Sequence, residues 1–147
     1  MNVVVKDIMS KNSISISAHR SIGHARTLIQ NNHISILPVI DKDDFVVGVL
    51  SPKDFINELD NESTVNKVMS EKVFSIPQYE KVQIAARMMR NHKIHHLMVT
   101  HEKKLIGVIS SYDLLKLVEG HRFEIKNQGT VSSKGKGKRA KSELQED

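Results

Sequence analysis

The chain contains the same seven-residue pattern twice, as GVLSPKD from Gly48 and as GVISSYD from Gly107. Both copies read as glycine, two apolar residues, serine, two variable residues and aspartate. Branched apolar residues before the serine favour a strand, and a serine followed three positions later by an acidic residue is typical of a helix start. Each copy therefore predicts a strand that runs directly into a helix.

The chemistry of such a junction suits a sugar-phosphate. A helix start presents free backbone N–H groups and the positive end of the helix dipole to a phosphate, and a carboxylate one turn into the helix accepts hydrogen bonds from ribose hydroxyls. The alternative is that Ser51 with Asp54, and Ser110 with Asp113, only cap their helices, an effect of about 1 kcal/mol. The two interpretations coexist, because a junction that caps itself when empty can face a ligand when occupied.

The two patterns belong to a longer internal repeat. Setting Val5 on Val65 aligns VKDIMS with VNKVMS at a spacing of 60 residues, and the spacing becomes 59 after one residue drops out of the loop that follows Asp41. The identities stay in register over the whole repeat with this single gap. Because such agreement is not expected by chance, the repeat predicts two copies of one structural unit.

Each copy predicts the element order β-α-β-β-α. Alternating or branched residues indicate strands at 14–16, 36–40 and 45–50, and again at 74–76, 97–100 and 105–109. Apolar residues at helical spacing indicate a helix after Ser21 and an equivalent one over 82–89. Further helices over 52–59 and 111–118 follow the junctions. The fold class is therefore α+β, and since each copy has one apolar sheet face, the two copies should pack against each other.

With these motifs, the duplicated unit resembles a CBS domain, and the tandem pair resembles a Bateman module. The resemblance rests on the M-S start, a serine in the first strand, the P-V of the second strand and the two G-h-h-S-x-x-D patterns, and it covers residues 3–120. It implies two tandem β-α-β-β-α CBS units with pseudo-two-fold symmetry, over 1–60 and 61–120. Met98 replaces the second-strand proline, so the two clefts between the units are not expected to be equivalent.

The resemblance implies a ligand class and a set of binding residues. Clefts of this family commonly bind adenine-containing ligands such as AMP, ADP, ATP or S-adenosylmethionine, and the modules often form homodimers. In the family's pattern the junction serine contacts phosphate, the junction aspartate contacts ribose, a first-strand serine lies near the base, and the segment before the second strand lines the base pocket. The ligand-binding residues predicted in this way are Ser15, His33, Ile36, Ser51, Asp54, Ser75, His95, His96, Ser110 and Asp113.

His95 and His96 are the most informative difference between the copies, because the first copy has Ser35 and Ile36 there. A histidine with a pKa near 6.5 gains charge beside a phosphate, so one cleft should hold phosphate better than the other. Which cleft the histidines face is left open. A metal site is not expected, because neighbours on a strand point to opposite faces and no carboxylate or cysteine stands at zinc-ligand spacing.

Composition and charge narrow the class of protein. No catalytic constellation or Walker-type loop is present, so we expect neither an enzyme nor an obligatory cofactor. With no cysteine and no apolar run long enough to cross a bilayer, a cytoplasmic protein without membrane contact is expected. Residues 121–147 hold seven Lys/Arg against four Asp/Glu and contribute three of the five net positive charges. They predict a C-terminal arm at 121–125 and a disordered basic tail.

The leading hypothesis is a regulatory module that binds an adenine-containing ligand, a small-molecule nucleotide or S-adenosylmethionine, and responds by a change of shape or of partner. One alternative is a module for protein interaction or dimerisation whose clefts are vestigial. Another is a protein that contacts nucleic acid through its basic tail. A homodimer is expected in the leading case, and an unidentified protein partner is compatible with it.

Overall fold

The structure, a computed structural model, describes residues 2–11, 14–56 and 60–120. Met1–Leu117 forms one compact unit that contains the sheets of both repeats. The arm and the disordered tail predicted for 121–147 lie outside the described residues. No helix in the described part is long and apolar enough to cross a membrane.

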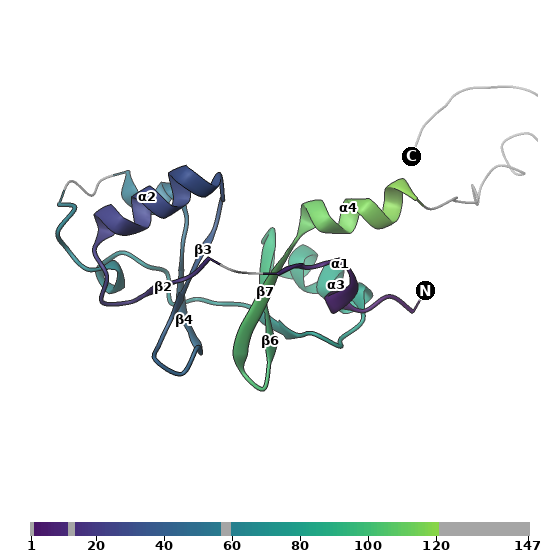
Figure 1. The fold of residues 1–147 in the computed structure, drawn as a ribbon. Coiled ribbons are helices and arrows are strands. Elements are labelled where there is room, and N and C mark those ends of the chain that lie inside the picture. The colour runs from purple at the N-terminus through teal and green to yellow at the C-terminus, as the bar shows by residue number, and fades with distance from the viewer. Residues whose placement is uncertain (1, 12–13, 57–59, 121–147) are drawn as a thin grey trace, which may run out of the picture. The chain divides into compact units, whose positions relative to one another are not determined.

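The two repeats have the same order of elements (Figure 1). The first repeat consists of β2 (Ile16–Ser17), α2 (Ile22–Asn32), β3 (Leu37–Ile40), β4 (Val46–Leu50) and a 3-10 helix, η1 (Pro52–Phe55). The second consists of β5 (Ser75–Pro77), α3 (Val82–His92), β6 (His96–His101), β7 (Lys104–Ser110) and α4 (Ser111–Glu119). Short elements precede each repeat, namely α1 (Val5–Ile8) with β1 (Ser10–Lys11), and the 3-10 helix η2 (Val65–Lys67). The predicted α+β class with two β-α-β-β-α units is confirmed.

Each repeat builds its own sheet. The first sheet has the order β2-β3-β4, and the second has the order β1-β7-β6-β5. In both, the first strand of the repeat is parallel to the second, and the second is antiparallel to the third. The helix between the first two strands covers the apolar side of the sheet, so that each repeat has a separate hydrophobic core.

The long helices begin and end as their sequences direct. The Ser21 hydroxyl accepts a hydrogen bond from the His24 backbone N–H at 3.1 Å, which confirms the predicted cap of α2. Both α2 and α3 end at a residue in the left-handed conformation, His33 with φ 53° and Lys93 with φ 55°. Such a residue stops a helix abruptly. The chain then turns directly into the segment that leads to the second strand of each repeat.

The start of each repeat packs on the other repeat. Val5 is buried in the core of the second repeat, and Val65 is buried in the core of the first. The contacts are reciprocal, because the Val5 N–H donates to the Glu80 carbonyl and the Val65 N–H donates to the Arg20 carbonyl, both at 2.8 Å. The first residues of each repeat along the sequence therefore belong to the core of the other repeat in space.

The two junctions differ in the helix that follows. A helix was predicted over 52–59, but the structure has a 3-10 turn at Pro52–Phe55, in which the Asp54 N–H donates to the Ser51 carbonyl at 2.9 Å. This i to i+3 bond is the 3-10 pattern, and residues 57–59 lie outside the described part. The second junction leads into a regular α-helix, α4, as predicted.

Candidate ligand-binding site

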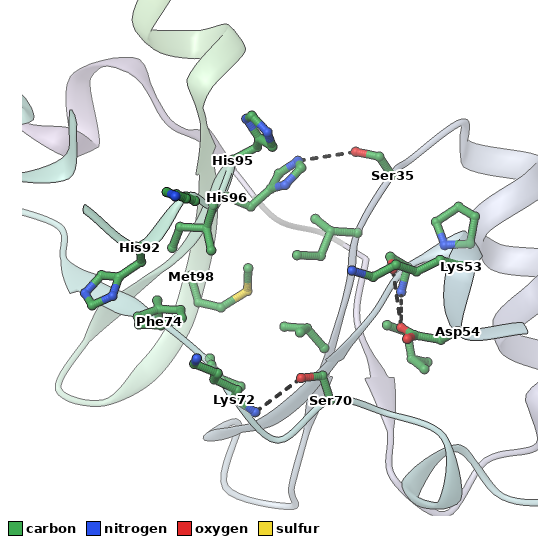
Figure 2. A pocket seen from close by; sticks show the side chains of 18 residues that line it. Ser35, Lys53, Asp54, Ser70, Lys72, Phe74, His92, His95, His96 and Met98 are labelled. Carbon is green, nitrogen blue, oxygen red and sulfur yellow. Dashed lines mark hydrogen bonds between the residues drawn. The ribbon is translucent and has the colours of Figure 1, made fainter. Parts of the chain in front are cut away.

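A cavity of about 600 Å³ lies between the junction of the first repeat and the segment before β6 of the second. We call it the larger cavity. It lies within the range of pockets that hold small molecules. Figure 2 shows Lys53 and Asp54 on one side of it, facing Lys72, Phe74 and the histidines on the other. Its walls come from four segments of the chain, namely Ser35–Ile36, 49–54, Ser70 with 72–74, and 92–96 with Met98.

At the first junction the aspartate is already oriented. The Asp54 Oδ2 atom accepts a hydrogen bond from the Ser51 backbone N–H at 2.7 Å and a longer one from the Ser51 hydroxyl at 3.4 Å. Among the described residues both bonds use Oδ2, which leaves Oδ1 available to a ligand. Because Asp54 is half-buried and lines the cavity, the junction caps itself and still presents a carboxylate oxygen.

The opposite wall combines aromatic, apolar and basic groups. The rings of Phe74 and His92 lie 4.4 Å apart between centroids and are tilted by 32°. The Lys72 ammonium lies 5.7 Å from the centre of the Phe74 ring, within the distance of a cation–π contact. Met98 and Ile36 contribute apolar surface. Such a wall provides both a slot for a flat base and positive charge beside it.

A smaller cavity of about 270 Å³ lies at the second junction. There Asp113 is buried, with 6% of its surface exposed. Its Oδ2 accepts from the Ser110 N–H at 2.9 Å, and its own N–H donates to the Ser110 hydroxyl at 3.1 Å. The Asp113 Oδ1 lies 3.2 Å from the Lys116 ammonium. Both carboxylate oxygens of this junction are therefore engaged within the protein.

His96 lines both cavities. One of its ring nitrogens, Nε2, lies 3.3 Å from the Ser35 hydroxyl of the first repeat (Figure 2). Burial lowers the pKa of His96 below its usual 6.5, and the charge of His95 lowers it further, while the Asp113 carboxylate raises it. The neutral ring is thus favoured in the empty protein. His95 turns elsewhere, with its Nδ1 3.3 Å from the Ser111 hydroxyl.

Most of the predicted site residues come together at these cavities. The larger cavity is lined by Ile36, Ser51, Asp54, His95 and His96, and the smaller one by His33, Ile36, His96, Ser110 and Asp113. Ser15 and Ser75 line neither of the two, and their role near the base stays a prediction. The open question about the histidines has a structural answer, since His95 lines the larger cavity and His96 lines both.

Two lysines of the larger cavity were missed, Lys53 and Lys72, whereas Lys93 begins the segment 93–96 that the family resemblance assigned to the base pocket. Lys53 is one of the two variable residues of the junction pattern, and Lys72 follows the M-S start of the second repeat. A comparison of the two repeats at equivalent positions would have identified them. In the described part of the chain no group of three or more His, Asp or Glu side chains is arranged to hold a metal ion.

Comparison with known proteins agrees with this arrangement. The sequence model of the CBS domain matches residues 5–61 and again 65–120. The chain belongs to the CBS domain family. A CBS domain-containing protein of Dictyostelium discoideum is 32% identical over 80% of this chain and 92% of its own length.

Other CBS-family relatives are longer proteins. The uncharacterized protein MJ1232 of Methanocaldococcus jannaschii is 30% identical, and the match covers 81% of this chain but 40% of that protein. Among solved structures, the CBS domain pair of protein MJ0100, in complex with 5'-methylthioadenosine and S-adenosyl-L-methionine, has a TM-score of 0.74 and 27% identity. That match covers 83% of this chain and 100% of that one. The chain thus spans less than half of MJ1232 and most of the Dictyostelium protein.

Proposed function

We propose that this CBS pair is a regulatory module that binds an adenine-containing ligand in the larger cavity. One observation carries the proposal: the serine–aspartate junction of one repeat faces, across a cavity of about 600 Å³, the segment of the other repeat that is predicted to line the base pocket. The solved CBS pair with bound adenosyl ligands supports the same ligand class. We propose no chemical step, because the module acts by binding.

The side chains suggest how such a ligand lies. Ile36, Val49 and Met98 provide apolar surface for the base, and Phe74 adds an aromatic ring. The Oδ1 of Asp54, which no described residue engages, accepts hydrogen bonds from ribose hydroxyls, since a carboxylate is an acceptor only. The Ser51 hydroxyl lies at the same junction and donates to a phosphate or to another polar substituent beyond the sugar.

Binding at this place is suited to regulation. The cavity takes one wall from the first repeat and the other from the second, so a ligand in it contacts both. A ligand shifts only those states for which its affinities differ. An arrangement of the repeats that closes the two walls on the ligand is therefore favoured by binding, and this change is available to a partner or to a larger protein as a signal.

Titration calorimetry with AMP, ADP, ATP and S-adenosylmethionine tests the proposal. We expect dissociation constants between micromolar and millimolar, equivalent to roughly −4 to −8 kcal/mol. Asp54→Ala should weaken binding by about tenfold or more, because a ribose loses a charged acceptor. Asp41→Ala is the control, since Asp41 lines neither cavity. Silence with every ligand would contradict the proposal and favour an interaction module.

The homodimer expected from the family resemblance remains a proposal, and so do the cytoplasmic location and the nucleic-acid contact through 121–147. Sedimentation velocity at several protein concentrations, with and without the bound ligand, measures the oligomeric state directly. Deleting 128–147 should leave nucleotide binding unchanged, and any salt-dependent affinity for nucleic acid should disappear with the tail.

A further inference from the structure

The two cavities differ in charge at positions that the internal repeat makes equivalent. Lys53, Lys72 and Lys93 line the larger cavity. At spacings of 59 or 60 residues, the positions equivalent to these three are Tyr112, Asn12 and His33. All three differences therefore add a positive charge to the larger cavity, and each comes from a different segment of the chain.

His92 and His95 follow the same trend, because they line the larger cavity and not the smaller one, whereas His96 lines both. His95 and His96 stand where the first repeat has Ser35 and Ile36. His92 lies at the last position of α3 and also lines the larger cavity. The rim of this cavity thus has three lysines and three titratable rings, against a single carboxylate, Asp54.

These lysines are available to a ligand. Within the described residues, no salt bridge joins Lys53, Lys72 or Lys93 to a carboxylate. At the smaller cavity the balance is different, because Lys11 is its one lining lysine and Asp113 is its one lining carboxylate. Asp113 is in addition held by Lys116 at 3.2 Å. The smaller cavity therefore has little net charge to offer to an anion.

We infer that the larger cavity selects adenine ligands that carry a chain of two or more phosphates, and that it discriminates against cationic adenosyl ligands. This inference rests on the proposed function and specifies its ligand class. A chain of phosphates presents several anionic oxygens, and each lysine ammonium binds them through charge-assisted hydrogen bonds. The sulfonium centre of S-adenosylmethionine would instead meet like charge.

The placement of the lysines explains why more than one phosphate is needed. Lys53 follows the first junction, whereas Lys72 lies across the cavity beside Phe74 (Figure 2). Lys93 directly follows α3 and lines the same cavity. A single phosphate next to the ribose reaches the junction side, and a longer chain is required to contact both sides at once.

A ligand series separates these contributions. Calorimetry at fixed pH and low salt compares adenosine, AMP, ADP, ATP, S-adenosylmethionine and inorganic tripolyphosphate. We expect ADP or ATP to bind at least tenfold more tightly than adenosine and S-adenosylmethionine, because two or more lysine contacts are added. Affinity for ATP should fall with increasing salt, while affinity for adenosine should stay nearly constant.

Variants identify the residues that cause the difference. Lys53→Ala and Lys72→Ala should each lower the affinity for ATP by roughly three- to tenfold and leave that for adenosine unchanged. Tyr112→Ala is the matched control for Lys53, since it changes the equivalent position of the other repeat. Lys42→Ala, in the exposed turn before β4, controls for the general loss of a surface lysine.

The outcomes distinguish the two proposals. Equal affinities for adenosine, S-adenosylmethionine and ATP, together with neutral lysine variants, would overturn the inference and leave the proposed function standing. If tripolyphosphate binds as tightly as ATP in a way that depends on Lys53 and Lys72, and adenosine does not bind, the cavity selects anions but does not recognise adenine. That result would support the anion selectivity and overturn the proposed adenine ligand. If none of these ligands binds, both the proposed function and the inference about phosphate chains are overturned.

Discussion

At Ser51 the chain leaves β4 through a proline into a short 3-10 turn, whereas at Ser110 it leaves β7 directly into the nine-residue helix α4. Both junctions have the same serine and aspartate, and both aspartates accept from the serine N–H. They differ in the second carboxylate oxygen, which is held by Lys116 at the second junction. Among the described residues, both carboxylate oxygens of Asp113 therefore have partners within the protein, whereas only one oxygen of Asp54 does.

This difference teaches how one motif can serve two purposes after duplication. An internally satisfied, buried carboxylate stabilises the start of a helix, and opening it to a ligand requires an ion pair to be broken. A half-buried carboxylate with one unengaged oxygen is ready for a ligand and contributes less to the fold. We therefore expect mutations at the second junction to affect stability most and mutations at the first to affect binding most.

The largest effect is expected at the glycines that begin the two patterns. A Cβ added at Gly107 would lie 2.7 Å from the Ser10 carbonyl oxygen, which belongs to the backbone of β1. At Gly48 the nearest atom would be the Met69 Sδ at 2.5 Å, while the Ser70 carbonyl oxygen lies at 3.0 Å. A side chain moves more easily than a strand, so Gly107→Ala should cost about 2–3 kcal/mol and Gly48→Ala about 1–2 kcal/mol.

Urea denaturation of both variants measures this order. The free energy of unfolding should fall further for Gly107→Ala, because β1 must separate from β7 or shift along it. Equal losses in the two variants would show that the two repeats tolerate a Cβ equally, and would contradict the proposed difference in their packing.

The second effect concerns the two aspartates. Asp113→Ala should lower the free energy of unfolding by about 1–2 kcal/mol, because it removes the ion pair with Lys116 and leaves the half-buried Ser110 N–H without its carboxylate acceptor. Asp54→Ala should cost less, since the helix after it is a short 3-10 turn. Ligand affinity should fall more in Asp54→Ala than in Asp113→Ala. Denaturation and calorimetry on the same two variants measure both, and a variant that is worse in both assays would refute the division of roles.

Local sequence patterns were sufficient for most of the elements, except the 3-10 turn after Ser51, and eight of the ten predicted site residues line one of the two cavities. The Ser21 cap, the alternation at 74–76 and the serine–aspartate spacing each depend on a few adjacent residues. The internal repeat then predicted that the strand-to-helix junction would occur twice in the structure. These features follow from periodicity and hydrogen bonding within one turn or one strand.

What could not be predicted depends on contacts between the repeats. The start of each repeat crosses to the other, and Met9 packs against Gly107 while Met69 packs against Gly48. The methionine and the glycine are both part of the family's pattern, but the pattern does not reveal that they meet across repeats. The assembly of Lys53, Lys72 and Lys93 around one cavity has the same cause, since each lies at an exposed position with no local periodicity.

The smallest effect is the pH dependence that His96 adds to stability. Burial and the neighbouring His95 lower the pKa of His96 in the folded chain, although Asp113 opposes this. The unfolded chain, with a pKa near 6.5, therefore binds a proton more readily than the folded one. The contribution of His96 to stability is intact above pH 6.5 and is lost as the pH falls from there through the lower folded value.

Urea denaturation between pH 7.5 and pH 5 tests this in wild type and His96→Gln, with His24→Gln on the exposed face of α2 as the control. The groups that face His96 are His95 and Asp113, with Lys93 next to it in the larger cavity and Lys11 and His33 in the smaller one. The fall in stability toward acid should be shallower in His96→Gln and unchanged in His24→Gln.

A bound polyphosphate should reverse the trend, because its charge favours protonated His96. Binding then takes up a proton, and the affinity increases as the pH falls. If His96→Gln has the same dependence of stability and of ligand affinity on pH as wild type, the pKa of His96 is not lowered by folding, and the prediction is wrong.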